Sequence, residues 1–441
     1  MRTKLPPNKM GLWMLTALVA GNMIGSGIFL LPSNLAKIGS ITLYSWLFTT
    51  IGAFLLALLF SRMSQLVTKA GGPYAYTRAA FGDFMGFQTA YSYWVTVWVG
   101  NAAIALAAIG YARVFWPALD NSTITCFATI ALVWLISLIN CHGAKTIGAF
   151  QLLTTICKIA PLLFIGIVGW WYFHPSYITQ SFNLSTQSNF TAISNGAALT
   201  LWAFIGVESA VVGSDTVANP KRTIPLATLL GTLIAASVYI ACSTVIMGMV
   251  PAAKLIQSAS PFAIAAKQIL GAWGAQLVAA TAIISCVGAL NGWVLLQGQV
   301  AMAAAEDRLF PKIFGVRNRH DIPAKGVIIT SILISLLLFL TASPNLVKQF
   351  HLIILLAVLT ALIPYFYTAM AAIIIMPQKI VNKKELHFSM VIAVLAGIYS
   401  FWTLLSSGKT IVFYGSILIF SSLPLYAWLR WHQNKGLKNE K

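Results

Sequence analysis

The chain has 441 residues, of which 59% are hydrophobic and only 8% are charged. Soluble domains carry about 25% charged residues, so this composition excludes a soluble globular protein and predicts an integral membrane protein. The formal net charge of +19 raises the question of a nucleic-acid partner, but the basic residues lie in short segments between apolar runs, which excludes that class.

Apolar runs of about 20 residues recur along the chain, and runs of this length predict membrane-spanning helices rather than a β-barrel. We therefore expect an all-α membrane protein with twelve transmembrane helices in one domain, residues 1–441. The expected spans are residues 12–36, 42–62, 85–112, 123–140, 147–171, 193–217, 224–249, 273–304, 326–342, 350–376, 388–405 and 410–429.

The basic residues predict the orientation of these spans. With the amino terminus in the cytoplasm, twelve spans place both termini there, and most of the 28 Lys and Arg residues then lie in cytoplasmic segments. The basic residues expected outside are Lys37, Arg113, Lys254, Lys267, Lys348 and Lys409. This asymmetry follows the positive-inside rule, so the lipid bilayer, and not a nucleic acid, is the expected partner of the basic segments.

The first span contains a dense cluster of small residues, Gly21-Asn22-Met23-Ile24-Gly25-Ser26-Gly27, followed by Pro32. Such a sequence supports a continuous helix poorly, and unwound backbone in a membrane is tolerated only where protein or a watery cavity satisfies it. Freed amides at a helix N-terminus also attract carboxylates. We expect a broken helix here; close helix packing is the alternative use of these glycines.

The sixth span repeats this theme, because Gly206 precedes Glu208 and Ser209. Paired interrupted helices at corresponding positions of two halves are typical of secondary transporters built from inverted repeats. This pattern predicts one repeat over about residues 12–171 and a second over about 193–376, with additional helices at 388–405 and 410–429.

Glu208 is the one carboxylate among nine that lies deep inside an apolar stretch. An ionisable side chain at this depth costs at least ~2.5–3.5 kcal/mol on insertion scales, which favours a functional role. The alternative is a neutral carboxylic acid that is hydrogen-bonded in the core.

Few other residues carry chemistry. Five cysteines are scattered without metal-ligand spacing and predict apolar packing rather than disulfides; they are Cys126, Cys141, Cys157, Cys242 and Cys286. The sequence has no paired catalytic carboxylates, nucleophile–base motif or phosphate loop. It therefore predicts neither an enzyme nor a cofactor or metal site.

Several motifs resemble the amino acid–polyamine–organocation transporter superfamily, and within it the bacterial basic amino acid/polyamine antiporters, the arginine/agmatine antiporters above all. The motifs are Gly21–Pro32, Gly71–Tyr76, Tyr93-Trp94 with Gly100-Asn101, Leu201–Ser209 followed by Asn219–Pro225, Gly292-Trp293 and Asp307–Phe314. The resemblance extends from about Met10 to the last span.

This resemblance implies a five-plus-five inverted repeat of the LeuT type, with broken helices 1 and 6, that works by alternating access in the bacterial inner membrane. It implies exchange of a basic amino acid for its decarboxylated amine, which aids acid resistance. Arginine/agmatine is the first candidate pair, followed by lysine/cadaverine and ornithine/putrescine. The sequence is also compatible with a homodimer.

The resemblance further implies a substrate site formed by Met23, Ser26, Gly27, Tyr93, Asn101, Ile104, Trp202, Ile205, Trp293 and Ala357. In it, Ser26 and Gly27 receive the α-carboxylate and the Met23 carbonyl receives the α-ammonium group. Trp202 stacks on the cationic group, and Trp293 forms the inner wall. For both tryptophans, packing is the alternative role.

Other residues are implied as gates or sensors. Asn101 matches an amide that contacts a guanidinium, with interhelical hydrogen bonding as its alternative. Tyr93 is implied to form an inner gate near the substrate, and Tyr74 to help close the inward route, although Tyr74 could instead anchor the chain at a membrane interface. Glu208 is implied in pH sensing rather than in simple pairing with the substrate.

Two departures from the family pattern affect the substrate and the mechanism. Ile104 and Ala357 make the pocket more apolar, which could shift the preference toward lysine, ornithine or their diamines. Lys158 in the fifth span matches a position where proton-coupled members of the superfamily have a lysine in place of a coupling sodium ion. A proton-coupled amino acid symporter that uses Lys158 is therefore the alternative function, and a snorkelling or permanently charged structural lysine is the alternative role.

Overall fold

The computed structural model describes residues 11–67, 71–142, 159–212, 217 and 219–439. Over these residues the chain is helical and contains no β-strand, which confirms the predicted all-α class. In chain order the helices are α1 (Leu12–Met23), α2 (Ser26–Leu35), α3 (Thr42–Leu66), α4 (Pro73–Phe81), α5 (Asp83–Ala112), η1 (Pro117–Asp120), α6 (Ser122–Cys141), η2 (Gly169–Tyr172), α8 (Pro175–Gln180), α9 (Asn189–Leu201), η3 (Trp202–Phe204), α10 (Ser209–Val212), α11 (Pro220–Met249), α12 (Ala252–Leu255), α13 (Pro261–Glu306), η5 (Lys312–Gly315), α14 (Ala324–Leu340), α15 (Leu346–Lys379), α16 (Lys383–Leu405), α17 (Lys409–Phe420) and α18 (Ser422–Asn439).

Among the described residues, ten helical segments are long and apolar enough to cross a membrane. The two remaining predicted spans, 147–171 and 326–342, correspond to shorter apolar helices at Ile159–Tyr172 and Ala324–Leu340. Residues 147–158 lie outside the described part of the chain. Ten spans are therefore established by length and composition, and the count of twelve stays a prediction.

Two predicted spans have different limits in the structure. The backbone of α13 leaves helical geometry at Gly271 (φ 70°), so the predicted span 273–304 is only its second part. The predicted span 410–429 is divided between α17 and α18, and α18 continues to Asn439. Hydropathy missed this extension because the last turns are polar; among them, Arg430 Nη2 binds Asp83 Oδ2 at 2.8 Å.

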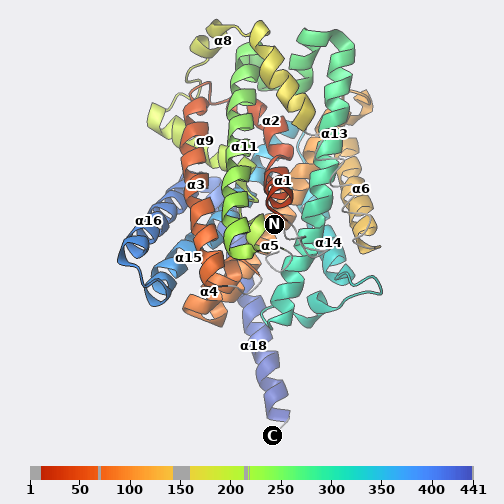
Figure 1. Cartoon of the computed structure of the whole chain (residues 1–441). Helices are drawn as coiled ribbons and strands as arrows, with labels where there is room; N and C mark the ends of the chain where they lie inside the picture. Colours follow the sequence, from red (N-terminus) through yellow and green to blue (C-terminus); the bar gives the residue numbers. More distant parts are fainter. Residues whose placement is uncertain (1–10, 68–70, 143–158, 213–216, 218, 440–441) are drawn as a thin grey trace, which may run out of the picture.

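Burial separates a central set of helices from a peripheral one. In the most apolar stretch of α5, 94% of the residues are buried, compared with 39% in α6 and 17% in Lys409–Gln433. Figure 1 shows α1, α2 and α5 in the middle of the bundle, with α3, α15 and α16 on one side, α6 and α14 on the other, and α18 extending from the bundle to the C-terminus. The buried interior is therefore built around α5, and the peripheral helices expose apolar side chains, as expected of helices that face lipid.

Both predicted interruptions are present. The first span stops at Met23 and resumes at Ser26, with a non-helical Gly25 (φ −134°, ψ −137°) between the two parts. The second leaves α-helical geometry from Trp202 to Glu208 and passes through Gly206 at φ +110°, which favours glycine.

The two interruptions lie against each other. A Cβ atom on Gly27 would come within 3.1 Å of the Ala203 Cα atom, and one on Gly206 within 3.5 Å of the Asn22 carbonyl carbon. The glycines therefore serve both of the roles considered from the sequence, because they break the helices and also let the breaks approach closely.

Candidate functional site: a pocket between two helix interruptions

A narrow pocket, with a cavity volume of about 20 Å³, lies where the two interruptions meet α5 and α13. Its lining residues are Asn22, Met23, Gly25, Ser26, Gly27, Thr96, Gly100, Ile104, Trp202, Ile205 and Trp293. On α5, Thr96, Gly100 and Ile104 recur every four residues, so they form one stripe of that helix. The pocket wall is mostly apolar, with few polar groups.

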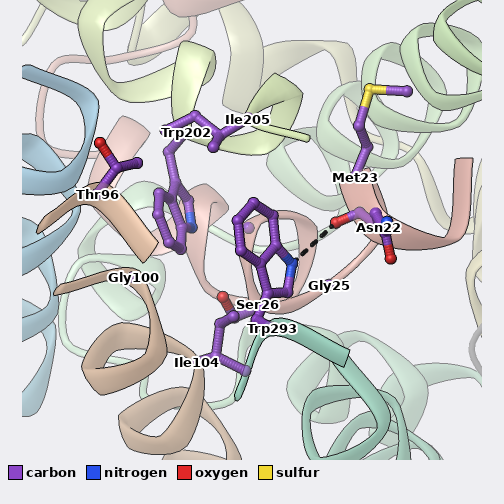
Figure 2. A pocket seen from close by; sticks show the side chains of 11 residues that line it. Asn22, Met23, Gly25, Ser26, Thr96, Gly100, Ile104, Trp202, Ile205 and Trp293 are labelled. Carbon is purple, nitrogen blue, oxygen red and sulfur yellow. Dashed lines mark hydrogen bonds between the residues drawn. The ribbon is translucent and has the colours of Figure 1, made fainter. Parts of the chain in front are cut away.

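Two indole rings dominate the pocket. Figure 2 shows the rings of Trp202 and Trp293 next to each other, with Thr96 on one side and Asn22 and Met23 on the other. Trp293 Nε1 donates a hydrogen bond of 3.4 Å to the Asn22 carbonyl oxygen. Trp202 lies over Gly100, where a Cβ atom would come within 3.0 Å of its ring. Aromatic faces of this kind attract cationic groups, most strongly where water is excluded.

The first turn of α2 provides a binding site for an anionic group. Ser26 and Gly27 are the first two residues of that helix, and the first amides of a helix have no acceptor within it. The Ser26 hydroxyl is buried and has no partner among the described residues. The pocket therefore offers N–H and O–H donors near one end and indole faces beside them, a combination suited to a ligand with a carboxylate and a cationic group.

Glu208 does not line the pocket; its carboxylate is fully buried in a cluster of hydrogen bonds beside it. Tyr93 from α5 donates to Oε1 at 2.8 Å, and Tyr365 from α15 donates to Oε2 at 2.6 Å. The Gly206 amide also donates to Oε2, at 3.2 Å. The acid thus ties the second interruption to two other helices, and it is not a free counter-ion for a ligand in this conformation.

Residues 10–424 match the family model for amino acid permeases. The chain belongs to the amino acid permease family. It is 37% identical over 419 residues to the putrescine transporter PotE of Escherichia coli (strain K12), which covers 95% of each chain. It is also 39% identical over 365 residues to the cadaverine/lysine antiporter of the same strain, which covers 82% of each chain. The PotE protein of Haemophilus influenzae is 35% identical over 422 residues, 96% of this chain and 97% of that one.

Most of the predicted substrate residues of this permease come together in one place, since the pocket is lined by Met23, Ser26, Gly27, Ile104, Trp202, Ile205 and Trp293. Tyr93, Asn101 and Ala357 do not line it. Ala357 is fully buried on α15, where its carbonyl accepts a hydrogen bond from Thr360, which in turn accepts one from the pocket residue Thr96. Ala357 therefore lies behind the pocket wall.

Asn101 has a protein partner that the sequence did not indicate. Its Nδ2 donates a 2.7 Å hydrogen bond to Gln297 Oε1 on α13, and both side chains are fully buried. This contact is an interhelical hydrogen bond of the kind considered from the sequence, and substrate binding by Asn101 stays a prediction.

Tyr74, another predicted gating residue, does not line the pocket. Tyr74 is buried on α4, where its hydroxyl hydrogen-bonds to Asp307; burial and this carboxylate raise the pKa of Tyr74. A role of Tyr74 as a gate or as an interfacial anchor stays a prediction. Lys158, the candidate for proton coupling, lies outside the described residues.

Sequence reasoning left several residues of this region unassigned. Asn22, Gly25 and Gly100 were visible in the motifs but carried no assigned role, and Thr96 could have been found one helical turn before Gly100. Tyr365 and Gln297 gave no signal, because a single tyrosine or glutamine in an apolar helix is most simply explained by packing.

Proposed function

We propose that this permease is an antiporter that exchanges a basic amino acid for its decarboxylated amine by alternating access. The observation that carries the proposal is the pocket at the junction of the two helix interruptions, with the α2 N-terminus and two indole rings in its wall. The named activities of the relatives, putrescine transport and cadaverine/lysine antiport, point to the same substrate class.

The pocket chemistry supports exchange between these two kinds of substrate. An amino acid brings a carboxylate to the Ser26 and Gly27 amides and a cationic side chain to the indoles of Trp202 and Trp293. The corresponding amine lacks the carboxylate and keeps the cationic groups. Both therefore use the aromatic part of one site, and the amino acid alone also uses the helix terminus.

For the substrate pair, we favour lysine/cadaverine or ornithine/putrescine over arginine/agmatine. The relatives are named for putrescine and for cadaverine and lysine, and the apolar Ile104 in the pocket wall suits an alkyl chain that ends in an ammonium group. Arginine/agmatine exchange, and with it a role in acid resistance, remains the competing pair.

The transport cycle we propose follows the five-plus-five repeat, with twelve spans and both termini in the cytoplasm of a bacterial inner membrane. The cluster of Glu208, Tyr93 and Tyr365 joins three helices next to the pocket. Its rearrangement would allow the second interruption to move relative to α5 and α15. Protonation of Glu208 would then couple pH to this movement.

Reconstituted liposomes test the proposal. Vesicles are loaded with lysine, cadaverine, ornithine, putrescine, arginine or agmatine, and the uptake of each labelled partner is measured with and without a pH gradient. We expect uptake to require an internal substrate and to be fastest for a diamine and its parent amino acid. Uptake into empty vesicles that depends on a proton gradient would refute exchange and establish the symporter.

A further inference from the structure

Gln297 and Asn101 form a buried amide pair between the two helices that supply much of the pocket wall. Asn101 belongs to α5 and Gln297 to α13, and neither side chain is exposed to solvent. The hydrogen bond from Asn101 Nδ2 to Gln297 Oε1 is 2.7 Å long. This hydrogen bond therefore sets the orientation of the Asn101 carboxamide relative to that of Gln297.

This bond leaves unused hydrogen-bonding capacity in a place without solvent. Asn101 Oδ1 and Gln297 Nε2 are buried and have no partner among the described residues. A carboxamide offers two donor hydrogens and an oxygen that can accept twice, and buried polar atoms are normally paired. The free acceptor and the free donor are therefore available to a further partner.

The pair lies directly behind the pocket wall. Asn101 follows the pocket residue Gly100, and Gln297 lies four residues, one helical turn, after the pocket residue Trp293 on the same face of α13. A substrate that is anchored at the α2 N-terminus and extends past Trp293 would bring its far end toward these amides.

The cationic end of such a substrate needs neutral acceptors here. None of the pocket-lining residues in the described chain is a carboxylate, and the carboxylate of Glu208 is engaged by Tyr93, Tyr365 and the Gly206 amide. An ammonium group has only donor hydrogens. Asn101 Oδ1 can accept from it, and the oxygen of Gln297 has a second lone pair.

We propose that Gln297 is a positioning residue for the distal ammonium group of the substrate, because it holds Asn101 Nδ2 and thereby leaves Asn101 Oδ1 as the acceptor. This inference rests on the proposed function and specifies its ligand, a chain with a terminal ammonium group. Loss of the Gln297 oxygen would release the Asn101 carboxamide and remove one acceptor, while the rest of the pocket stays unchanged.

The test compares Gln297→Leu with Gln297→Glu in the full chain in detergent, by titration calorimetry. The probes are lysine and norleucine, which differ only in the distal ammonium group. We expect Gln297→Leu to raise the Kd for lysine about tenfold and to leave the Kd for norleucine unchanged. A hydrogen bond to a charged ammonium group contributes more binding free energy than one between neutral groups. Gln297→Glu keeps an acceptor for Asn101 Nδ2 and should bind lysine as well as the original protein, or better.

A second buried amide pair on the same helix is the matched control. Asn140 Nδ2 on α6 donates to Asn291 Oδ1 on α13 at 2.9 Å, and it also leaves one acceptor and one donor without partners in the described chain. Because α6 contributes no residue to the pocket, Asn140→Leu should lower the thermal stability without changing the Kd for lysine.

Equal changes for lysine and norleucine, or an equal effect of Asn140→Leu on lysine, would overturn the role of Gln297. So would a Gln297→Glu variant that folds, by thermal melting, but binds lysine as poorly as Gln297→Leu. Liposome exchange is measured separately on the unaltered protein. Lysine binding that depends on Gln297 without exchange would refute the antiporter and leave the positioning role intact, and absence of lysine binding to the unaltered protein would overturn both.

Discussion

Tyr93 donates a 2.8 Å hydrogen bond from its hydroxyl to Glu208 Oε1, and this bond joins α5 to the interruption between α9 and α10 across 115 positions of the chain. The other carboxylate oxygen is held by Tyr365. Hydrogen bonds from phenol donors favour the carboxylate form of a buried acid, whereas burial favours its neutral form. Movement of any of the three segments therefore changes the environment of Glu208, which links its protonation to the conformation of the pocket region.

We expect Glu208→Gln to lower the rate of exchange about tenfold, because an amide cannot accept both phenol hydrogen bonds on two equivalent oxygens, and to flatten the dependence of the rate on pH. An amide of this kind does not titrate, and its Nε2 would face hydroxyl groups that now donate. The measurement is the initial rate of diamine exchange in liposomes from acidic to neutral pH. The control is Glu385→Gln, which removes a surface carboxylate paired with Arg62 at 2.8 Å. A Glu208→Gln variant with the original pH profile would remove the sensor role.

Gly206 should tolerate no side chain. Its φ of +110° strains any other residue, and a Cβ atom would come within 3.3 Å of the Trp293 ring. We expect Gly206→Ala to reduce exchange at least about tenfold, because it adds strain of ~1–2 kcal/mol and also pushes on the pocket wall. Gly408→Ala is the matched control, since Gly408 has φ +90° with no atom within 4 Å of the added Cβ. Equal losses of exchange in the two variants would show that strain alone is responsible.

The features that the sequence predicted follow from constraints that a bilayer places on short segments of the chain. Long apolar runs predict spans because backbone polar groups in a bilayer must be satisfied within the helix. The Gly/Ser cluster around Gly25 predicts a break because such residues support a continuous helix poorly. Glu208 stands out because an ionisable group in such a run is costly. Each of these signals lies within a few residues of sequence.

The features that were missed depend on how distant helices are placed against each other. Tyr365 meets Glu208 across 157 positions, and Gln297 meets Asn101 across 196. Neither contact can be predicted from hydropathy or from local helix propensity. Ala357 does not line the pocket, and its carbonyl oxygen accepts a hydrogen bond from Thr360 on the same helix, so its contact with substrate stays a prediction.

Trp202 allows a direct test of the aromatic seat. Trp202→Leu should raise the KM for diamines roughly 30-fold, which corresponds to ~2 kcal/mol for a desolvated cation over an indole. Trp202→Phe should have a smaller effect, because it keeps an aromatic face and because the indole Nε1 has no partner among the described residues. Trp402→Leu is the control, since Trp402 packs on Phe48 with ring centroids 4.7 Å apart and does not line the pocket. Equal effects of Leu and Phe at position 202 would indicate packing alone.

Ser26 should distinguish the two classes of substrate. Its hydroxyl is buried at the first turn of α2 and lacks a partner in the described chain, so it can donate to the α-carboxylate of an amino acid but has no such group to bind in a diamine. We expect Ser26→Ala to raise the KM for lysine about tenfold and to leave the KM for cadaverine within about twofold, as measured by uptake into liposomes loaded with the other substrate. Ser285→Ala removes another buried hydroxyl without a described partner, on α13 and outside the pocket, and should change neither value. A parallel rise for lysine and cadaverine would mean that Ser26 supports the fold of α2 and does not recognise the carboxylate.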